Sequence, residues 1–221
     1  MIVGLTGGYC AGKDVVARVL AGRGFSVIDV DALGHDALRE KEAEVIAAFG
    51  PSVRTATGID RKALGRIVFS DAAALARLES VVHPVMVRDV KKMIAAMSGD
   101  VLINAAILHH MGLHTLCHAV ICVRAPRVAR VFRAMRRDRL TFRAAWARIR
   151  AQKDVCASGR GTRHGLFSAS GRGTRHGLFS ASGRGKPQFN DPPVDTYTVR
   201  NRGSMRSLER RVAQLDRLMR G

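Results

Sequence analysis

The stretch GGYCAGKD at residues 7–14 decides the fold of this chain. It matches the pattern GxxxxGK, in which glycines let the backbone turn successive amide groups toward one phosphate. An apolar run, Met1–Leu5, precedes the stretch, and apolar side chains at helical spacing follow it over Lys13–Leu20. The positive end of that helix adds its partial charge to the amide groups. This order of strand, loop and helix predicts a nucleotide-binding loop, and the alternative is a glycine-rich turn with a solvent-facing lysine.

The end of this stretch indicates how phosphate and metal are held. Lys13 is expected to bridge the β- and γ-phosphates of ATP. Asp14 stands where Ser or Thr usually gives a hydroxyl group to Mg²⁺. A carboxylate can also bind Mg²⁺, but its negative charge opposes the phosphates. Asp14 is therefore a candidate metal ligand that departs from the usual residue type.

Two carboxylates follow the second apolar run, in the stretch VIDVD at residues 27–31. In an open α/β sheet such residues lie at the carboxyl edge, beside the phosphate loop. Alternation along a strand places Asp29 and Asp31 on the same side. One of them can accept a proton from an attacking hydroxyl group or hold the metal. The alternative is the cap of a helix that starts at Ala32.

Short apolar runs alternate with helical patterns along the rest of the chain. The predicted strands are Met1–Leu5, Val27-Ile28, Val101–Ile103, Ala119–Val123 and Thr196–Val199. A long amphipathic region over 75–97 contains Pro84, which is expected to bend or restart the helix because proline has no amide hydrogen. Further helices are expected from Pro126, from Thr141 and after Ser204. The alternation predicts a three-layer α/β fold, a five-stranded parallel sheet with helices on both faces.

The composition is that of a globular chain with an unusual charge. Of 221 residues, 47% are hydrophobic and 25% charged, which excludes a wholly disordered or collagen-like protein and predicts one folding unit. No run approaches the roughly 18 apolar residues of a membrane span, and the N-terminus does not resemble a secretory signal. A soluble, cytoplasmic protein is expected. The net charge of +19 predicts an anionic partner: a phosphate-bearing small molecule, nucleic acid or an anionic membrane.

A perfect tandem repeat interrupts the chain near its end. The 12-residue unit ASGRGTRHGLFS occupies residues 157–168, recurs unchanged over 169–180 and begins again at 181. Its content of Gly, Ser and Arg cannot bury a face, which predicts a flexible surface insertion over about 157–186. The insertion holds six basic residues and no acidic one, so the rest of the chain still carries a net charge of +13.

Cysteines and histidines offer two further candidate features. The four cysteines, at positions 10, 117, 122 and 156, form no CxxC pair, which predicts reduced thiols and no structural disulfide. A cluster of irregular spacing comprises His109, His110, His114, Cys117 and His118. Zinc needs four convergent ligands, which this spacing does not guarantee. A partly exposed loop is expected there, with a metal site as the alternative.

Together these features and several longer motifs resemble the dephospho-CoA kinase family. The motifs are GLTGG at 4–8, AGK at 11–13, VIDVD at 27–31, GIDRKALG at 58–65, LE at 78–79, HP at 83–84, RAMRRD at 133–138, RIRAQ at 148–152 and NRGS at 201–204. They extend over nearly the whole chain apart from the repeat, and GIDRKALG is not shared by phosphate-loop proteins in general. The resemblance implies one kinase domain over 1–221. Its parts would be a substrate-binding helical region at about 32–98, a lid at about 126–152, the insertion, and a final strand and helix over 194–221.

The resemblance also implies roles for individual residues. The ATP phosphates would be held by Gly8, Tyr9, Cys10, Ala11, Gly12, Lys13, Asp14 and Val15. Asp31 would be the catalytic carboxylate and, with Asp14, a candidate Mg²⁺ ligand. His83 would contact dephospho-CoA. Arg133 and Arg137, four residues apart on a lid helix, would face the same way and clamp phosphates, so that Lys13, Asp31 and Arg137 are the expected catalytic residues.

The sequence departs from the family pattern at three places. Asp14 replaces a hydroxyl residue, and Tyr9-Cys10 replaces a pair of small residues in the loop. The stretch AILHH at 106–110 stands where the family usually has PLLFE, so His110 occupies the place of an acid.

The primary hypothesis is therefore Mg²⁺-dependent phosphoryl transfer from ATP to the ribose 3′-hydroxyl of dephospho-CoA, giving coenzyme A and ADP. One alternative keeps the fold and changes the acceptor to a nucleoside or nucleotide. Another is a nucleic-acid-binding protein whose Arg-rich repeat contacts phosphate backbones, although the repeat carries one aromatic residue per unit and no known binding module. Oligomeric state is not predicted.

Overall fold

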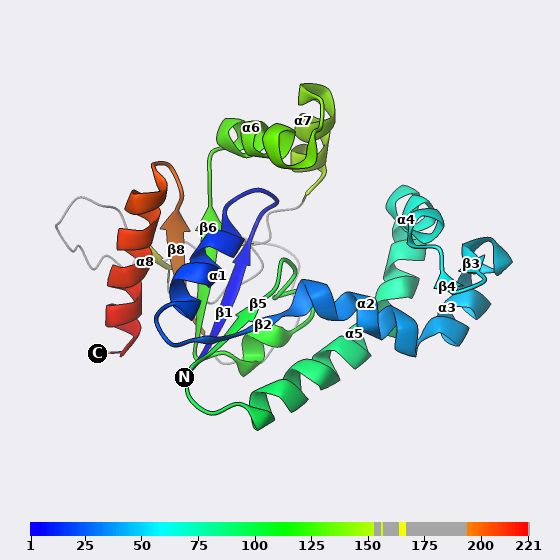
Figure 1. Ribbon diagram of the computed structural model, residues 1–221, viewed down its shortest axis with the longest axis horizontal. Helices are drawn as coiled ribbons and strands as arrows, with labels where there is room; N and C mark the ends of the chain where they lie inside the picture. Colours follow the sequence, from blue (N-terminus) through cyan, green and yellow to red (C-terminus); the bar gives the residue numbers. More distant parts are fainter. Residues whose placement is uncertain (153–155, 157–163, 167–193, 221) are drawn as a thin grey trace, which may run out of the picture.

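A parallel sheet of six strands forms the centre of the computed structural model, which describes residues 1–152, 156, 164–166 and 194–220 (Figure 1). The strand order is β2-β5-β1-β6-β8-β7, and every neighbouring pair is parallel. The strands are β1 (Ile2–Gly7), β2 (Ser26–Asp29), β5 (Val101–Asn104), β6 (Ala119–Arg124), β7 (His164–Leu166) and β8 (Asp195–Arg200). Because all strands run the same way, their carboxyl ends meet at one edge, where ligands bind in open sheets of this kind.

The five predicted strands are confirmed, with bounds that differ by at most two residues. The sixth strand, β7, was not predicted, because it lies inside the tandem repeat and pairs in parallel with β8. The expectation of a flexible insertion is therefore wrong for residues 164–166. The remaining repeat residues lie outside the described part of the chain. The role of the repeat in nucleic-acid binding therefore stays a prediction.

Helices cover both faces of the sheet, as predicted. The longer helices are α1 (Lys13–Ala21), α2 (Val30–Glu40), α3 (Glu42–Phe49), α4 (Arg61–Ser70), α5 (Ala72–Ala96), α6 (Arg127–Asp138), α7 (Phe142–Ala151) and α8 (Met205–Arg220). Side chains of β1 such as Val3 and Leu5 pack against α1 and α8 on one face. Alternate strand residues such as Ile28 and Ile103 pack against α2 and α5 on the other face. Burial of these side chains, at about 1.5–3 kcal/mol each, drives the layering.

The longest helix, α5, runs unbroken from Ala72 to Ala96 through Pro84. Of the two predicted effects of Pro84, the restart is therefore wrong, and the bend stays a prediction. No helix among the described residues is both long enough and apolar enough to cross a membrane.

Two groups of helices project from the sheet (Figure 1). The helices α3, α4 and the first half of α5 enclose their own apolar cluster, which includes Val45, Leu64 and Ala74. A small antiparallel pair, β3 (Arg54–Thr55) and β4 (Gly58–Ile59), and a 3-10 turn, η1 (Pro51–Val53), complete this group. The helices α6 and α7 form the second group above the carboxyl ends of β1 and β6, around a core that includes Val131 and Ile149. The first group lies inside the predicted region at 32–98, which also contains most of α2 and the second half of α5 on the sheet, and the second group lies inside the predicted part at 126–152; the roles of both parts stay predictions.

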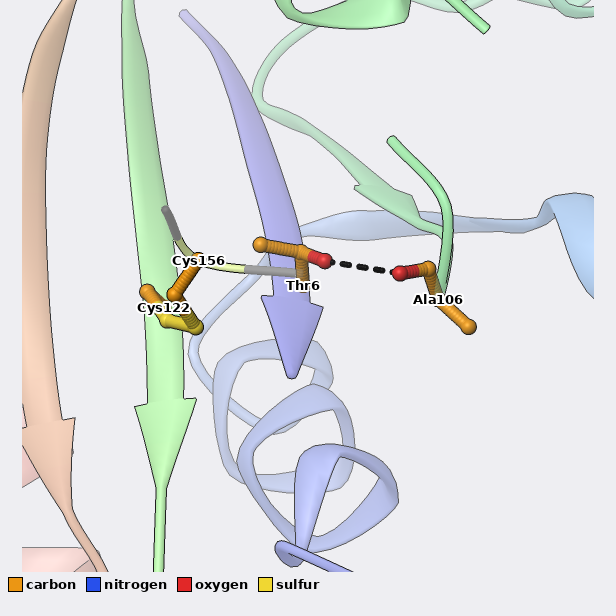
Figure 2. The surroundings of a disulfide bond; sticks show 4 residues. All are labelled: Thr6, Ala106, Cys122 and Cys156. Atoms are coloured by element: carbon orange, nitrogen blue, oxygen red, sulfur yellow. Dashed lines mark hydrogen bonds between the residues drawn. A yellow bond between two sulfur atoms is a disulfide. The ribbon is translucent and has the colours of Figure 1, made fainter. Parts of the chain in front are cut away.

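A disulfide joins Cys122 on β6 to Cys156, 34 residues further along the chain (Figure 2). The Cα atoms lie 5.9 Å apart, inside the range of ordinary disulfides. The expectation of four reduced thiols is wrong for this pair, because sequence spacing does not show that position 156 lies against the central sheet. Cys10 and Cys117 are free, and burial raises the pKa of the Cys117 thiol to about 12.

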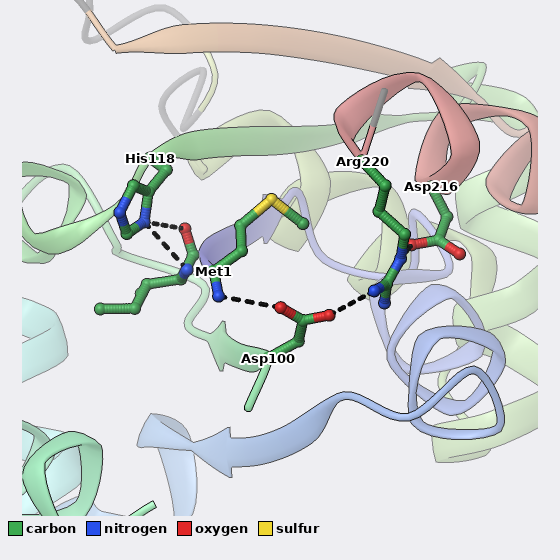
Figure 3. A network of polar contacts seen from close by, with 6 residues as sticks. Met1, Asp100, His118, Asp216 and Arg220 are labelled. Atoms are coloured by element: carbon green, nitrogen blue, oxygen red, sulfur yellow. Dashed lines mark hydrogen bonds and ion pairs between the residues drawn. The ribbon is translucent and has the colours of Figure 1, made fainter. Parts of the chain in front are cut away.

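A polar network ties α8 to the amino ends of the central strands (Figure 3). The amino group of Met1 donates to Asp100 Oδ1 at 2.8 Å, and Arg220 pairs with the other oxygen of Asp100. Arg220 also donates to the buried Asp216 at 2.8 Å, one helical turn away. Hydrogen bonding to the amino group lowers the pKa of Asp100. The network lies at the sheet edge opposite the phosphate loop, so it supports the fold without entering the site.

Candidate active site

The phosphate loop connects the end of β1 at Gly7 with the start of α1 at Lys13. Gly12 has a φ of +101°, a conformation that side chains with a Cβ rarely adopt. At Gly8 an added Cβ would lie 2.7 Å from the guanidinium of Arg130, so the Arg130 side chain would have to move. The first amide groups of α1 have no partner inside the helix and stand at its positive end. The loop therefore has the backbone path that an anionic ligand needs.

Three arginines of the second helical group and one glutamine just after it hold the outer half of the loop. Arg130 on α6 donates through Nε to the Tyr9 carbonyl at 2.7 Å. Gln152, just after α7, accepts from the Tyr9 amide at 2.7 Å and from Arg130 Nη2 at 2.8 Å. The ring of Tyr9 lies between the guanidinium groups of Arg137 and Arg148, 5.2 and 5.0 Å from its centroid. The loop is thus fastened directly to both lid helices.

The inner half of the loop is held by a residue that follows the last strand. Asn201 is buried, and its Nδ2 donates to the Ala11 carbonyl at 2.9 Å. Arg133 donates to the same carbonyl at 3.2 Å and to Asn201 Oδ1 at 3.2 Å. Sequence reasoning missed the roles of Arg130, Gln152 and Asn201. Gln152 and Asn201 are polar residues of the motifs RIRAQ and NRGS. These motifs are the sequence signal from which their roles could have been predicted.

A cavity of about 640 Å³ opens over the loop. Its lining comprises Gly7, Gly8, Tyr9, Cys10, Ala11, Gly12, Lys13, Asp14, Val15, Arg18, Asp31, Ala106, Arg133, Arg136, Arg137 and Gln152. The volume is within the range of small-molecule sites. Five basic side chains against two carboxylates give the cavity a positive balance, which favours a polyanionic ligand. The structure thus brings together all the predicted ATP-binding residues with Asp31, Arg133 and Arg137.

Lys13 and Asp31 form an ion pair at the centre of this lining. Lys13 Nζ lies 2.7 Å from Asp31 Oδ2, with the lysine side chain 11% exposed and the aspartate side chain 50% exposed. The other oxygen of Asp31 accepts from the Ala106 amide at 3.3 Å. The Thr6 hydroxyl donates to the Ala106 carbonyl at 3.0 Å and so anchors this loop to β1 (Figure 2). Asp31 is therefore held in place while it still faces the solvent, as a carboxylate that acts on an incoming hydroxyl group must be.

The carboxylates Asp29 and Asp31 have different surroundings, and the predicted common side is wrong. The strand ends at Asp29 and α2 begins at Val30, so period-two alternation stops between them. Asp29 is the helix cap, and its Oδ1 accepts from the amides of Asp31 and Ala32. The helix-cap alternative is right for Asp29, two residues earlier than expected, and of the two carboxylates only Asp31 lines the cavity.

The lid arginines face the cavity but also have protein partners. Arg137 donates to the neighbouring Asp138 at 2.9 Å, and the hydroxyl of Tyr9 also bonds to Asp138. The hydrogen bond from Arg137 is the main cause of the lowered pKa of Asp138, whereas burial is the main cause of the raised pKa of Tyr9. A bound polyphosphate would compete with Asp138 for Arg137.

The structure places His83 outside this cavity. It lies on α5 in a second hollow, which Glu79 and His110 also line. Burial lowers the pKa of the His83 imidazole, so the ring is mostly neutral at pH 7. The predicted contact of His83 with the acceptor stays a prediction.

The predicted histidine loop is only partly a cluster. The rings of His109 and His114 lie 4.8 Å apart, and burial lowers the pKa of His109 to about 4. His118 accepts from the Ile2 amide at 2.9 Å (Figure 3). Among the described residues, the group with metal-ligand spacing takes His110 from this loop and adds Glu79 and His83.

Gly12→Ala is expected to weaken ATP binding at least about tenfold. Its left-handed backbone costs a residue with a Cβ about 1–2 kcal/mol, and tenfold corresponds to about 1.4 kcal/mol. The added methyl group would also collide with Asn201 Nδ2. Isothermal titration with ATP measures the loss. Gly22→Ala is the matched control, because Gly22 has a φ of −64° and its added Cβ would lie 3.6 Å from the nearest atoms. Equal ATP affinity in the two variants would contradict the geometry of the loop.

A phosphate loop on the first strand of a parallel sheet, with a basic helical lid above it, defines a P-loop kinase. The fold agrees with the solved structure of dephospho-CoA kinase from Campylobacter jejuni, at a TM-score of 0.54 and 20% identity over 98% of this chain and 95% of that chain. A crystal structure of TT1252 from Thermus thermophilus has a TM-score of 0.73 at 29% identity, over 100% of this chain and 98% of that one.

The chain belongs to the dephospho-CoA kinase family. The family model described as dephospho-CoA kinase matches residues 1–158. The dephospho-CoA kinase of Moorella thermoacetica is 38% identical over 165 residues, which is 71% of this chain and 78% of that protein. The dephospho-CoA kinase of Borreliella burgdorferi is 40% identical over 128 residues, 57% of this chain and 62% of that protein.

Proposed function

We propose that this chain transfers the γ-phosphoryl group of ATP to the ribose 3′-hydroxyl of dephospho-CoA, giving coenzyme A and ADP in the last step of coenzyme A synthesis. The observation that carries the proposal is the 2.7 Å ion pair between Lys13 and Asp31 in the cavity of a dephospho-CoA kinase family member. One partner is a cation suited to phosphate, and the other is a carboxylate suited to a hydroxyl proton. Location in the cytoplasm is part of this proposal.

Donor binding uses the loop and Lys13. The amide groups at the start of α1 and the lysine ammonium group bind phosphate oxygens, so the triphosphate replaces Asp31 as a partner of Lys13. The carboxylate then becomes free to face the acceptor. The residues from Gly8 to Val15 contact the phosphates through their backbone. These contacts depend on the backbone conformation and not on the side-chain types.

Transfer forms one bond and breaks one. The 3′-oxygen of the ribose attacks the γ-phosphorus, the bond from that phosphorus to the β,γ-bridging oxygen breaks, and ADP leaves. Asp31 orients the hydroxyl group and accepts its proton. Arg133 and Arg137 neutralise the negative charge that spreads over the transferred group, and the lid excludes water.

The cavity fits the Mg²⁺ ion that this chemistry uses. Asp14 and Asp31 both line it, and carboxylate oxygens are the ligands that Mg²⁺ prefers. These two residues would hold the ion, which when bound neutralises charge on the phosphate oxygens. His83, in the second hollow, is proposed to contact a part of dephospho-CoA beyond the reacting ribose.

A coupled assay of ADP formation tests the proposal. With dephospho-CoA as the sole acceptor, ADP and coenzyme A should form in equal amounts, with coenzyme A identified by mass spectrometry. A parallel panel of nucleosides and nucleotides should give only background ADP. Turnover of a panel member in place of dephospho-CoA would overturn the acceptor and keep the kinase, whereas no transfer to any acceptor would overturn both.

A further inference from the structure

A second hollow, of about 490 Å³, lies between α5 and the loop that follows β5. Its lining comprises Ala76, Glu79, Ser80, His83, Pro84, Val87, His110 and Met111. None of these residues also lines the nucleotide cavity. The described lining contains no lysine or arginine, in a chain whose net charge is +19. A cation bound in this hollow is therefore not repelled by a lysine or arginine of the described lining.

Three side chains with metal-binding atoms converge in this hollow. Glu79 and His83 are four residues apart on α5, which places them on the same face of the helix. His110 reaches them from the loop after β5, and its Nε2 lies 2.9 Å from Glu79 Oε2. The rings of His83 and His110 stand edge to face, with centroids 5.7 Å apart. One ligand atom from each of the three residues lies within 4.8 Å of the others.

We propose that Glu79, His83 and His110 form a site for a divalent transition-metal ion, with Zn²⁺ as the ion that fits best. Two imidazoles and one carboxylate are a ligand set that zinc takes, with a fourth position left for water or another donor. Mg²⁺ fits poorly, because it demands oxygen ligands in octahedral geometry. The site is separate from the proposed Mg²⁺ ligands Asp14 and Asp31, but it shares His83 with the proposed contact to dephospho-CoA, so the binding tests below leave His83 unchanged and omit the acceptor.

The distances require only a small closure around the ion. Zinc binds imidazole nitrogen and carboxylate oxygen at about 2.0–2.2 Å, so tetrahedral ligand atoms lie roughly 3.4 Å apart. The contact between Glu79 and His110 is already shorter than this. The side chain of His110 is 61% exposed, so its ring is free to turn as His83 and the ion approach. The present ion pair between Glu79 and His110 is the arrangement that the metal would replace.

A bound ion would fasten α5 to the loop after β5. The same loop carries Ala106, whose amide donates to the catalytic candidate Asp31. Binding of an ion to the folded state alone stabilises that state in proportion to the logarithm of its concentration. The ion is therefore expected to raise the melting temperature of the protein, independently of any nucleotide.

Zinc titration of the chain, freed of any histidine tag and treated with a chelator, tests the site. Calorimetry without nucleotide or dephospho-CoA should give one Zn²⁺ per chain. His110→Ala should weaken binding roughly 100-fold and Glu79→Gln at least about tenfold, because each removes a ligand. His35→Ala is the matched control, since His35 is an exposed histidine on α2 outside the hollow, and it should bind zinc as the unmodified chain does.

A second readout separates a metal site from a merely structural ion pair. Zinc should raise the melting temperature of the unmodified chain and of His35→Ala, and leave that of His110→Ala unchanged. Co²⁺ in place of zinc should give the visible absorption of a nitrogen- and oxygen-bound ion. Failure of the unmodified chain to take up zinc in stoichiometric amount, or equal affinity in His110→Ala, would overturn the proposal. Neither result depends on kinase activity.

Discussion

Lys13→Ala should lower kcat/KM for ATP by at least roughly 1,000-fold, a loss typical of a group that neutralises charge in phosphoryl transfer. The Lys13 side chain is only 11% exposed and lies in the cavity wall, where its charge is less screened than on the surface. Arg133 donates to the loop carbonyls and Arg137 to Asp138, so neither occupies the position of the Lys13 ammonium group beside Asp31. Steady-state ADP formation with dephospho-CoA measures the effect.

The matched control is Lys91→Ala, which removes an exposed lysine from α5, on an element away from the cavity. It should keep turnover within about twofold of the unmodified chain, since surface substitutions usually have small effects. Circular dichroism and thermal unfolding of both variants separate lost chemistry from lost fold. Turnover of Lys13→Ala within about tenfold of the unmodified chain would mean that the loop does not hold the phosphates as proposed.

The fold was largely predictable, because its signals are local. The strand, loop and helix around Lys13 follow from glycine spacing and apolar periodicity within twenty residues. The buried strands show as short apolar runs because a parallel sheet is covered on both faces. Asp29 and Asp31 were candidates for the same reason, since they come after such a run, and the choice of Asp31 came from the family resemblance.

The missed features depend on contacts between distant segments. No sequence pattern indicates that Cys122 pairs with Cys156 or that Arg130 binds the Tyr9 carbonyl. The boundary between β2 and α2 was displaced because Asp29 can end a strand and cap a helix at once. The group of Glu79, His83 and His110 was not predicted, because its members lie in separate sequence motifs. Most of these misses concern which segments approach, whereas the boundary at Asp29 and the strand β7 concern the type of element.

Asp31→Asn should lower kcat by about 100- to 10,000-fold, the contribution of a positioned general base, and change the Kd for ATP by less than about threefold. The asparagine amide has nearly the same shape and keeps an oxygen that can accept from the Ala106 amide. It cannot accept the hydroxyl proton, and it no longer pairs with Lys13 as a carboxylate does. Loss of that pair frees Lys13 for phosphate, which opposes any loss of ATP affinity.

The split between kcat and ATP affinity is what assigns the role of Asp31. Single-turnover rates and calorimetry with ATP, both at saturating Mg²⁺, give the two quantities separately. Asp36→Asn serves as the control, because Asp36 is an exposed carboxylate on the same helix whose nearest partner, Arg39, lies 3.7 Å away. If Asp31→Asn loses ATP affinity as strongly as it loses kcat, Asp31 acts on the donor side, as a metal ligand. If kcat alone falls, the carboxylate acts on the acceptor hydroxyl group. That role explains why Asp31 is held in place and yet exposed to solvent.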